Sequence, residues 1–224
     1  MAVRIVDWEN CRKIWLVWRR RRLAVLPDNI SYLEDEESLC ALHHQPMSRA
    51  TDKVLTRLDD HCREIIRLAP FCVIATQGPG GADVTPRGDP PGFVRILDDQ
   101  HILLPDRVGN NRLDTMTNLF ANSAIGMIFL VPGMNETLRI NGTAKITDDA
   151  RLLEASAIQG RAPKVGLLIT IKEAFMHCPK AFIRSKLWDS SAQIDRSQLP
   201  SYAAILLDHC SDPDQEENDR QSKI

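Results

Sequence analysis

Short apolar runs separated by turn residues fill the chain between residues 71 and 174. Runs of this length, bounded by Gly, Pro, Asn and Asp, predict strands. We expect strands at residues 71–76, 82–86, 92–97, 101–105, 124–131, 137–146 and 166–174. Two helices are expected among them, at about residues 111–121 and 148–159. Because connections are short and strands do not alternate regularly with helices, the pattern predicts a closed antiparallel barrel rather than a Rossmann sheet.

A different spacing marks the region before these strands. Apolar residues there recur at steps of three and four, opposite a charged face: Val54, Leu55, Leu58, Cys62, Ile65 and Ile66. This period is that of one face of a helix. We therefore expect residues 28–68 to be mainly helical.

The two ends of the chain differ from its middle in charge. Residues 1–27 hold seven basic and two acidic residues, a net charge of +5 in a chain whose total is -2. Such a segment could be a basic amphipathic helix on a membrane surface, but it lacks a helix cap and a clean polar face, so we favour a poorly ordered extension. Residues 211–224 have the composition of a solvated acidic tail. We expect one domain, residues 28–210, between these ends.

The composition argues against several functional classes. A net charge of -2 and a pI near 6.3 lack the basic surplus that nucleic-acid phosphates require, so no nucleic-acid partner is expected. The apolar run from Ile14 to Trp18 is far too short to cross a bilayer, so no membrane partner is expected. The six cysteines form no Cys-x-x-Cys pair and no signal peptide is recognisable. We expect reduced thiols in a cytoplasmic protein, and no metal site.

One turn with candidate chemistry follows the second predicted strand. Its sequence, TPRGDPPGF at residues 85–93, carries three prolines around an arginine and an aspartate. Proline restricts the backbone, so the guanidinium of Arg87 is expected to point in a fixed direction.

A second turn, LPDRVGNNRLD at residues 104–114, leads from a strand through a Gly-Asn loop into a helix. Unpaired N–H groups at a helix N-terminus, with Asn110 or Asn111 as the cap, favour an anion. Arg107 and Arg112 flank the loop, and guanidinium groups match phosphate oxygens. Together with Arg87, they predict a phosphate-binding site.

Ordinary surface ion pairs are the alternative for these arginines. The candidate pairs are Arg87 with Asp89, Arg107 with Asp106, and Arg112 with Asp114. Exposed pairs of this kind contribute little stability. We do not expect all three arginines to be engaged in this way, because they converge on glycine-bearing turns at strand ends.

A third segment, HCPKAFIRSKLW at residues 177–188, has a proline at a predicted helix start. Lys180, Arg184 and Trp188 then follow at four-residue steps on one expected face. Two cations and an aromatic ring in line could hold a flat, anionic cofactor. The alternative is a solvated basic face with Trp188 packed on the core.

The chain resembles a known family over residues 31–208. The similarity lies in five segments in the family's order: FCVIAT, TPRGDPPGFVRILDD, LLPDRVGNNRLDTMTNL, FLVPGMNETLRINGTAKIT and HCPKAFIRSKLW. They resemble the pyridoxamine 5'-phosphate oxidase-like FMN-binding proteins, in particular an uncharacterised bacterial branch of FMN-dependent flavoproteins. The resemblance implies a mainly β fold with flanking helices, a six-stranded Greek-key FMN-binding split β-barrel. It also implies a homodimer that binds FMN at the subunit interface.

The resemblance further implies which residues contact FMN. Arg87 matches a phosphate-contacting arginine of the family. The strand whose backbone faces the flavin ring matches Leu104, Pro105 and Asp106. The cluster that closes on the ribityl phosphate matches Asn110, Asn111 and Arg112, with Arg107 nearby.

The C-terminal part of the resemblance is looser. Lys180, Arg184 and Trp188 match a segment that lies near the cofactor in the family. The Arg-x-His substrate-binding signature of pyridoxamine 5'-phosphate oxidases is absent, so that reaction is not expected. No general base is evident either, so catalytic residues stay unassigned.

Two classes of function follow from the resemblance. The first is an FMN-dependent oxidoreductase that acts on a small molecule, with NADH or NADPH as a possible electron donor. The second is a flavin-binding carrier or redox sensor without turnover. A deazaflavin or heme in the same barrel is a further alternative, although the arginine cluster suits a compact terminal phosphate.

Overall fold

The computed structural model describes residues 26–43, 45, 48–109 and 111–210. The chain divides into two compact units, one of His43–Ser190 and one of Met1–Leu42 with Ser191–Ile224. The acidic tail and all but the last two residues of the basic extension lie outside the described residues. The domain boundaries at residues 28 and 210 therefore stay a prediction.

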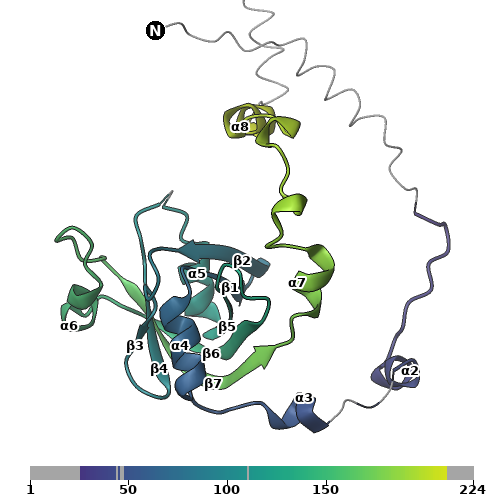
Figure 1. Ribbon diagram of the computed structural model, residues 1–224, viewed down its shortest axis with the longest axis horizontal. Coiled ribbons are helices and arrows are strands. Elements are labelled where there is room, and N and C mark those ends of the chain that lie inside the picture. Colours follow the sequence, from purple (N-terminus) through teal and green to yellow (C-terminus); the bar gives the residue numbers. More distant parts are fainter. Residues whose placement is uncertain (1–25, 44, 46–47, 110, 211–224) are drawn as a thin grey trace, which may run out of the picture. The chain divides into compact units, whose positions relative to one another are not determined.

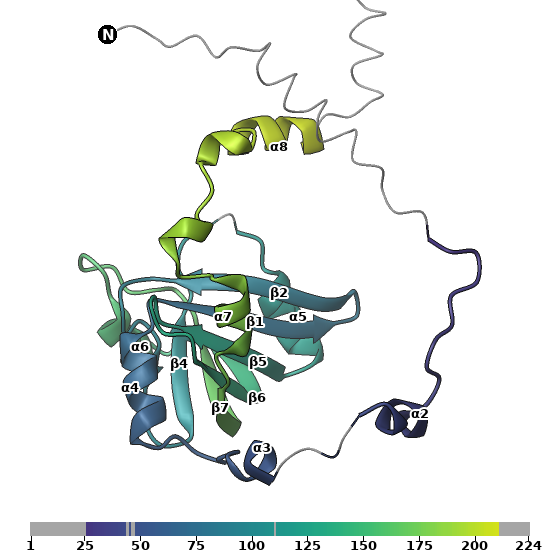
Figure 2. The same cartoon turned by 45° about the vertical axis from the view of Figure 1, so that its right-hand side comes forward.

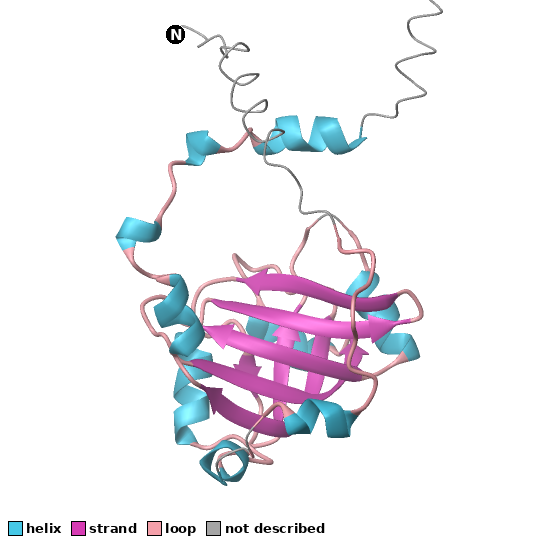
Figure 3. Cartoon of the chain, turned by 90° about the vertical axis from the view of Figure 1, so that its right-hand side faces the viewer, coloured by secondary structure: helices cyan, strands magenta, loops and turns pink. Residues whose placement is uncertain are grey.

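The larger unit is built on an antiparallel sheet whose seven strands, within the described residues, follow the order β2-β1-β5-β6-β7-β4-β3 (Figure 1). Their bounds are β1 Phe71–Gly78, β2 Gly81–Gly88, β3 Arg95–Ile96, β4 His101–Pro105, β5 Ala124–Leu130, β6 Thr137–Thr147 and β7 Gly166–His177. Figure 3 shows strands side by side across one face of this sheet. The expectation of a mainly β fold with flanking helices is confirmed.

Two details of the predicted barrel differ from the structure. The sheet is not closed, because β2 and β3 form its two ends and do not pair with each other. The family resemblance implied six strands, whereas the described residues form seven, one of which is β3 with only two residues. This strand is shorter than the predicted 92–97 because Gly92 is still in a turn, with φ of 83°, and the chain joins the sheet only at Arg95.

Helices of the larger unit are α3 Ser48–Asp52, α4 Asp60–Leu68, α5 Asp114–Ala121, α6 Ala150–Leu153 with the 3-10 turn η1 Glu154–Ser156, and α7 Lys180–Ser185. Helices α2 Glu36–Ala41, α3 and α4 cover about half of residues 28–68, so the expectation that this region is mainly helical is met only in part. The side chain of Asp59 accepts the N–H of Cys62 at 2.8 Å and so caps α4 at its N-terminus. Before it, Leu55 lies in a β-bridge with Ala174 of β7. Val54 and Leu58, the apolar neighbours of Leu55, thus have the spacing of a helix face without being part of a helix.

The core lies against one face of the sheet and includes residues of α4 and α5. Burial alternates along β1 and β5, as expected where one sheet face is covered. Helix α4 contributes Cys62, Ile65 and Ile66 to this core. Helix α5 adds Leu119 to the core. It lies by the β1–β2 turn (Figure 2), where its Asn118 donates to Thr76 at 3.2 Å.

The smaller unit contains α2 Glu36–Ala41, the 3-10 turn η3 Arg196–Gln198 and α8 Tyr202–Cys210, and the 3-10 turn η2 Ser190–Ala192 starts at its boundary. Neither α2 nor α8 has a buried residue. Nowhere in the described part of the chain is a helix both long and apolar enough to span a membrane. All five described cysteines are free thiols.

A glycine of β6 lies beside a bulge in β7, where Lys172 is left out of the pairing between the two strands. The register between them shifts at Asn141/Gly142. A Cβ at Gly142 would stand 2.1 Å from the carbonyl oxygen of Thr170, well inside contact distance. Only glycine therefore allows the two backbones to approach this closely.

We predict that Gly142→Ala destabilises the fold by about 2 kcal/mol or more, since the β7 backbone must shift. Gly80→Ala is the matched control, because a Cβ there meets nothing within 4 Å, and we expect a change within about 0.5 kcal/mol. Urea unfolding followed by circular dichroism measures both. Equal stabilities for the two variants would contradict this account of the bulge.

Candidate functional site

A pocket of about 840 Å³ opens where β2 and β4 end. This volume is in the range of roughly 300–1,000 Å³ that small-molecule and cofactor sites occupy. The wall comes from four segments of the larger unit: the end of β2, the end of β4 with the loop after it, Phe93, and the connection from η1 to β7. The residues are Pro86, Arg87, Gly88, Phe93, Pro105, Asp106, Arg107, Val108, Gly109, Asn111, Arg112, Leu113, Ile158, Arg161, Ala162, Pro163 and Lys164.

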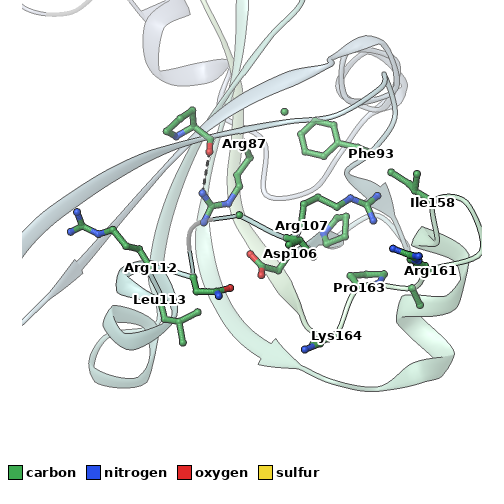
Figure 4. Close-up of a pocket in the computed structure, with 17 residues that line it drawn as sticks. Arg87, Phe93, Asp106, Arg107, Arg112, Leu113, Ile158, Arg161, Pro163 and Lys164 are labelled. Atoms are coloured by element: carbon green, nitrogen blue, oxygen red, sulfur yellow. Dashed lines mark hydrogen bonds between the residues drawn. The ribbon is translucent and has the colours of Figure 1, made fainter. Parts of the chain in front are cut away.

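The wall is strongly basic. Five of the described lining residues are cations, and one is a carboxylate: Arg87, Arg107, Arg112, Arg161 and Lys164, against Asp106. In the view of Figure 4, Arg87 and Arg112 lie on one side of Asp106, with Arg161 and Lys164 on the other. A concave surface with this excess of positive charge concentrates anions.

Arg87 projects from the end of β2. Its Nη1 donates to the hydroxyl of Thr85 at 2.7 Å and to the carbonyl of Pro86 at 3.0 Å, the bond drawn in Figure 4. These two bonds hold the guanidinium close to its own strand, in agreement with the fixed direction expected for it. The alternative pair with Asp89 does not form, because that carboxylate accepts from another arginine.

That other arginine is Arg107, at the exit of β4. Its Nε donates to Asp89 at 2.6 Å and its Nη1 to the carbonyl of Ser156 at 2.7 Å. The pair is shielded from water, since the side chains of Arg107 and Asp89 are 29% and 13% exposed. It joins the exits of β2 and β4 to η1, so Arg107 braces the pocket wall. The alternative that paired it with Asp106 is wrong.

Asp106 lies between these groups. Burial raises the pKa of its carboxyl above the ordinary value, and the nearby positive charge of Arg87 partly opposes this rise. Its backbone N–H donates to the carbonyl of Val165 at 3.0 Å, which ties the exit of β4 to the start of β7. The carboxyl therefore sits in the pocket as a desolvated group with a cation beside it.

The loop before α5 differs from the expected anion site. Helix α5 begins at Asp114, and Leu113 occupies the N-cap position without a capping side chain, so the expected cap by Asn110 or Asn111 is wrong. Asn111 takes a left-handed conformation, with φ of 58°, and lines the pocket; Asn110 lies outside the described residues. Arg112 pairs with Asp114 at 2.8 Å, as its surface-pair alternative had it. The carboxylate of Asp114 places negative charge in the first helical turn, where an anion was expected.

The three residues matched to the strand that faces the flavin ring do not all line the pocket. Pro105 and Asp106 line the pocket, whereas Leu104 is buried in the core with 1% exposure. Successive side chains on a strand point to opposite faces, which separates Leu104 from Pro105, whereas Asp106 lies beyond the end of β4. The resemblance implied that the backbone of Leu104, not its side chain, faces the flavin ring, and this role stays a prediction.

The three residues predicted near the cofactor from the C-terminal segment do not line this pocket. Lys180 and Arg184 lie on α7, which ends at Ser185 because Lys186 turns left-handed with φ of 51°. Trp188 is thus beyond the helix and not on its face, contrary to the expectation. Its Nε1 donates to the carbonyl of Met134 at 2.8 Å, and its ring stacks on Phe182 with centroids 5.8 Å apart. Contact of the three with a cofactor stays a prediction.

One wall of the pocket consists of residues that were not predicted to belong to the site. Ile158, Arg161, Pro163 and Lys164 lie on a segment that was expected to be partly helical and otherwise unassigned. The available signal was two cations around an Ala-Pro step directly after Gly160. Phe93 was also missed as a wall residue, although it stood in the quoted TPRGDPPGF motif.

Comparison with known proteins places the fold. Residues 58–178 match the family described as pyridoxamine 5'-phosphate oxidase. Because this match covers more than half of the chain, the protein belongs to the pyridoxamine 5'-phosphate oxidase family, which supports flavin binding at the family level. The search of curated proteins gave no match.

Among solved structures, HupZ from Group A Streptococcus is 20% identical, with 53% of this chain and 93% of HupZ covered and a TM-score of 0.43. An FMN-binding protein from Syntrophomonas wolfei subsp. wolfei is 13% identical, with coverages of 52% and 88% and a TM-score of 0.39. An F420 reductase is 16% identical, with coverages of 54% and 98% and a TM-score of 0.38.

We predict that the Asp89–Arg107 pair contributes measurably to stability. Asp89→Asn and Arg107→Gln should each destabilise the protein by about 1–3 kcal/mol, because each leaves a shielded polar partner unsatisfied. The double variant should cost less than the sum of the two. Urea unfolding of all four proteins gives the coupling energy, and strict additivity would show that the pair does not act as a brace.

Proposed function

We propose that the pocket binds FMN and that the protein is a flavin-dependent oxidoreductase acting on a small molecule. The observation that carries the proposal is the basic pocket of cofactor size at the ends of β2 and β4, in a chain that belongs to the pyridoxamine 5'-phosphate oxidase family. FMN combines a flat apolar ring system with one terminal phosphate. Apolar lining residues such as Phe93 and Ile158 suit the former, and the cations suit the latter.

The donor set of the pocket fits a phosphate group. A phosphate monoester carries a charge of about -1.5 to -2 near pH 7 and three strong acceptor oxygens. Arginine and lysine side chains are the usual partners of such oxygens. With five cations and one carboxylate in the wall, a bound phosphate would not be repelled.

The bound flavin would supply electron transfer, and the protein would position it. Arg87 would hold one side of the ligand with the guanidinium nitrogens that it does not direct to Thr85 and Pro86. Arg107 would keep the wall in shape through Asp89 and Ser156 rather than bind the ligand alone. Asp106, with its raised pKa, would present a carboxyl that can exchange a proton at a higher pH than an exposed aspartate.

The proposal includes the expectations that come from the family resemblance. These are a split barrel of Greek-key topology, a homodimer with FMN at the subunit interface, and a role for Lys180, Arg184 and Trp188 near the ring. They also include NADH or NADPH as electron donor and a cytoplasmic location. A second subunit would add its own residues to a pocket that is open in the single chain.

The first experiment is an FMN titration of the purified full-length protein, followed by anaerobic addition of NADH and of NADPH. Flavin absorption that bleaches with either nucleotide supports an oxidoreductase and identifies the donor. Tight FMN binding with a flavin absorption that neither nucleotide bleaches favours a carrier or sensor. Failure to bind FMN at all would remove the flavin from the proposal.

We predict that Arg87→Gln weakens FMN binding about tenfold to a hundredfold, the usual effect of losing a hydrogen bond to a charged group. Lys145→Gln is the control, since this exposed lysine on β6 does not line the pocket and should leave the dissociation constant unchanged. Quenching of flavin fluorescence measures both. Equal affinities of the Arg87 variant and the wild type would exclude Arg87 from the binding site.

A further inference from the structure

We infer that Asp106 takes up a proton when FMN enters the pocket, so that the affinity for the ligand depends on pH through this residue. The inference rests on the proposed function and assigns a role to the one carboxylate among the described lining residues. A charged carboxylate repels an anionic ligand, whereas its protonated form does not. Proton uptake would let the pocket hold an anion without a second negative charge in its wall.

The position of Asp106 leaves its carboxyl without local support. The residue is half-buried directly after β4, and its backbone bond to the carbonyl of Val165, at 3.0 Å, fixes it in the wall. Within the described residues its carboxylate forms no ion pair and accepts no hydrogen bond. Partial removal from water without such bonds disfavours the charged form of an acid.

The other charged groups of the pocket wall come from four segments, and all of them are cations: Arg87, Arg107, Arg112, Arg161 and Lys164. Two of these arginines are paired with carboxylates other than Asp106, since Arg107 binds Asp89 and Arg112 binds Asp114. Arg87 is the cation whose charge lowers the pKa of Asp106, against the rise that burial causes. Among the described groups, Arg87 therefore supports the charged form of Asp106.

Bound FMN would act on this carboxyl in three ways, all of the same sign. The phosphate adds negative charge to the pocket, and the bulk of the ligand displaces solvent from the wall. A phosphate that pairs with Arg87 also offsets the cation that supports the charged form of Asp106. Each effect disfavours the carboxylate and raises its pKa further. The complex thus keeps a proton on Asp106 up to a higher pH than the free protein, and binding is linked to proton uptake.

This linkage fixes the direction of the pH dependence. At low pH Asp106 is protonated in both the free protein and the complex, and it does not oppose binding. As the pH rises from the pKa of the free protein to that of the complex, binding requires an additional proton and the affinity falls. Above this interval the carboxylate is charged in both states, and the affinity stays lower by a constant factor.

The test is an FMN titration of the full-length wild type and of Asp106→Asn at several values from about pH 4 to pH 8. Asparagine has the shape of the protonated acid and does not titrate, while the titration of the FMN phosphate, near pH about 6, is common to both proteins. We predict that the ratio of the wild-type dissociation constant to that of Asp106→Asn is close to one at the acid end. It should rise to about fivefold or more at the basic end, as expected when one like charge is removed from the site. Quenching of flavin fluorescence gives the constants.

Three further variants make the comparison specific. Glu64→Gln is the matched control, because this exposed carboxylate on α4 does not line the pocket, and its ratio to the wild type should not change with pH. Asp106→Glu keeps a titratable carboxyl and should follow the pH dependence of the wild type. Asp106→Ser is a second uncharged variant, which gives the same ratio if Asp106→Asn does not fold. Circular dichroism at each pH checks that every variant is folded.

The outcomes separate this inference from the proposed function. A ratio that stays constant with pH for the uncharged Asp106 variants, or an equal rise for Glu64→Gln, would overturn proton uptake at Asp106. FMN binding, and with it the proposed function, would remain in either case. A wild-type protein that binds no FMN at any of these pH values defeats both.

Discussion

The ion pair between Asp89 and Arg107 connects the segments from which the pocket wall is built. It connects two segments that leave different strands of the sheet, and through the carbonyl of Ser156 it reaches a third. The backbone N–H of Asp89 also donates to the carbonyl of Pro70, at the entrance of β1, at 3.0 Å. A charged pair that is largely removed from water is strong only when its geometry and its further hydrogen bonds are good, as here. Arg107, which itself lines the pocket, is thereby held in place.

Much of the sheet could be predicted because its strands are apolar, short and bounded by turn residues. All seven predicted strands exist, and β4 has the predicted bounds, His101–Pro105. The prediction of secondary structure failed where a contact between distant parts of the chain determined the local structure. The apolar steps before Asp60 look helical, yet Leu55 is bound in a bridge to Ala174, more than a hundred residues away in sequence. Such a contact leaves no trace in a local window.

The candidate site was predictable in part for the same reason. Its arginines could be found from turns with glycine and proline, but their partners could not. Arg107 has a carboxylate next to it in sequence, Asp106, and nevertheless binds Asp89. Neighbours on an extended segment point in opposite directions, so pairing follows the arrangement of the strands. The hairpin that Ile158 and Arg161 form after η1 was missed because a two-residue turn with Gln159 in a left-handed conformation is not the Asn-Gly pattern by which such turns are usually identified.

The two ends of the open sheet have a consequence for self-association. Unpaired strand edges are templates on which further chains can add, and proteins usually interrupt them. One end here is β3, whose two residues are too few to guide a new strand. The other is β2, which contains Pro86, a residue without the N–H that a continuing ladder needs. Both ends of the described sheet thus carry a feature that disfavours the addition of a further strand and so limits fibril-like growth.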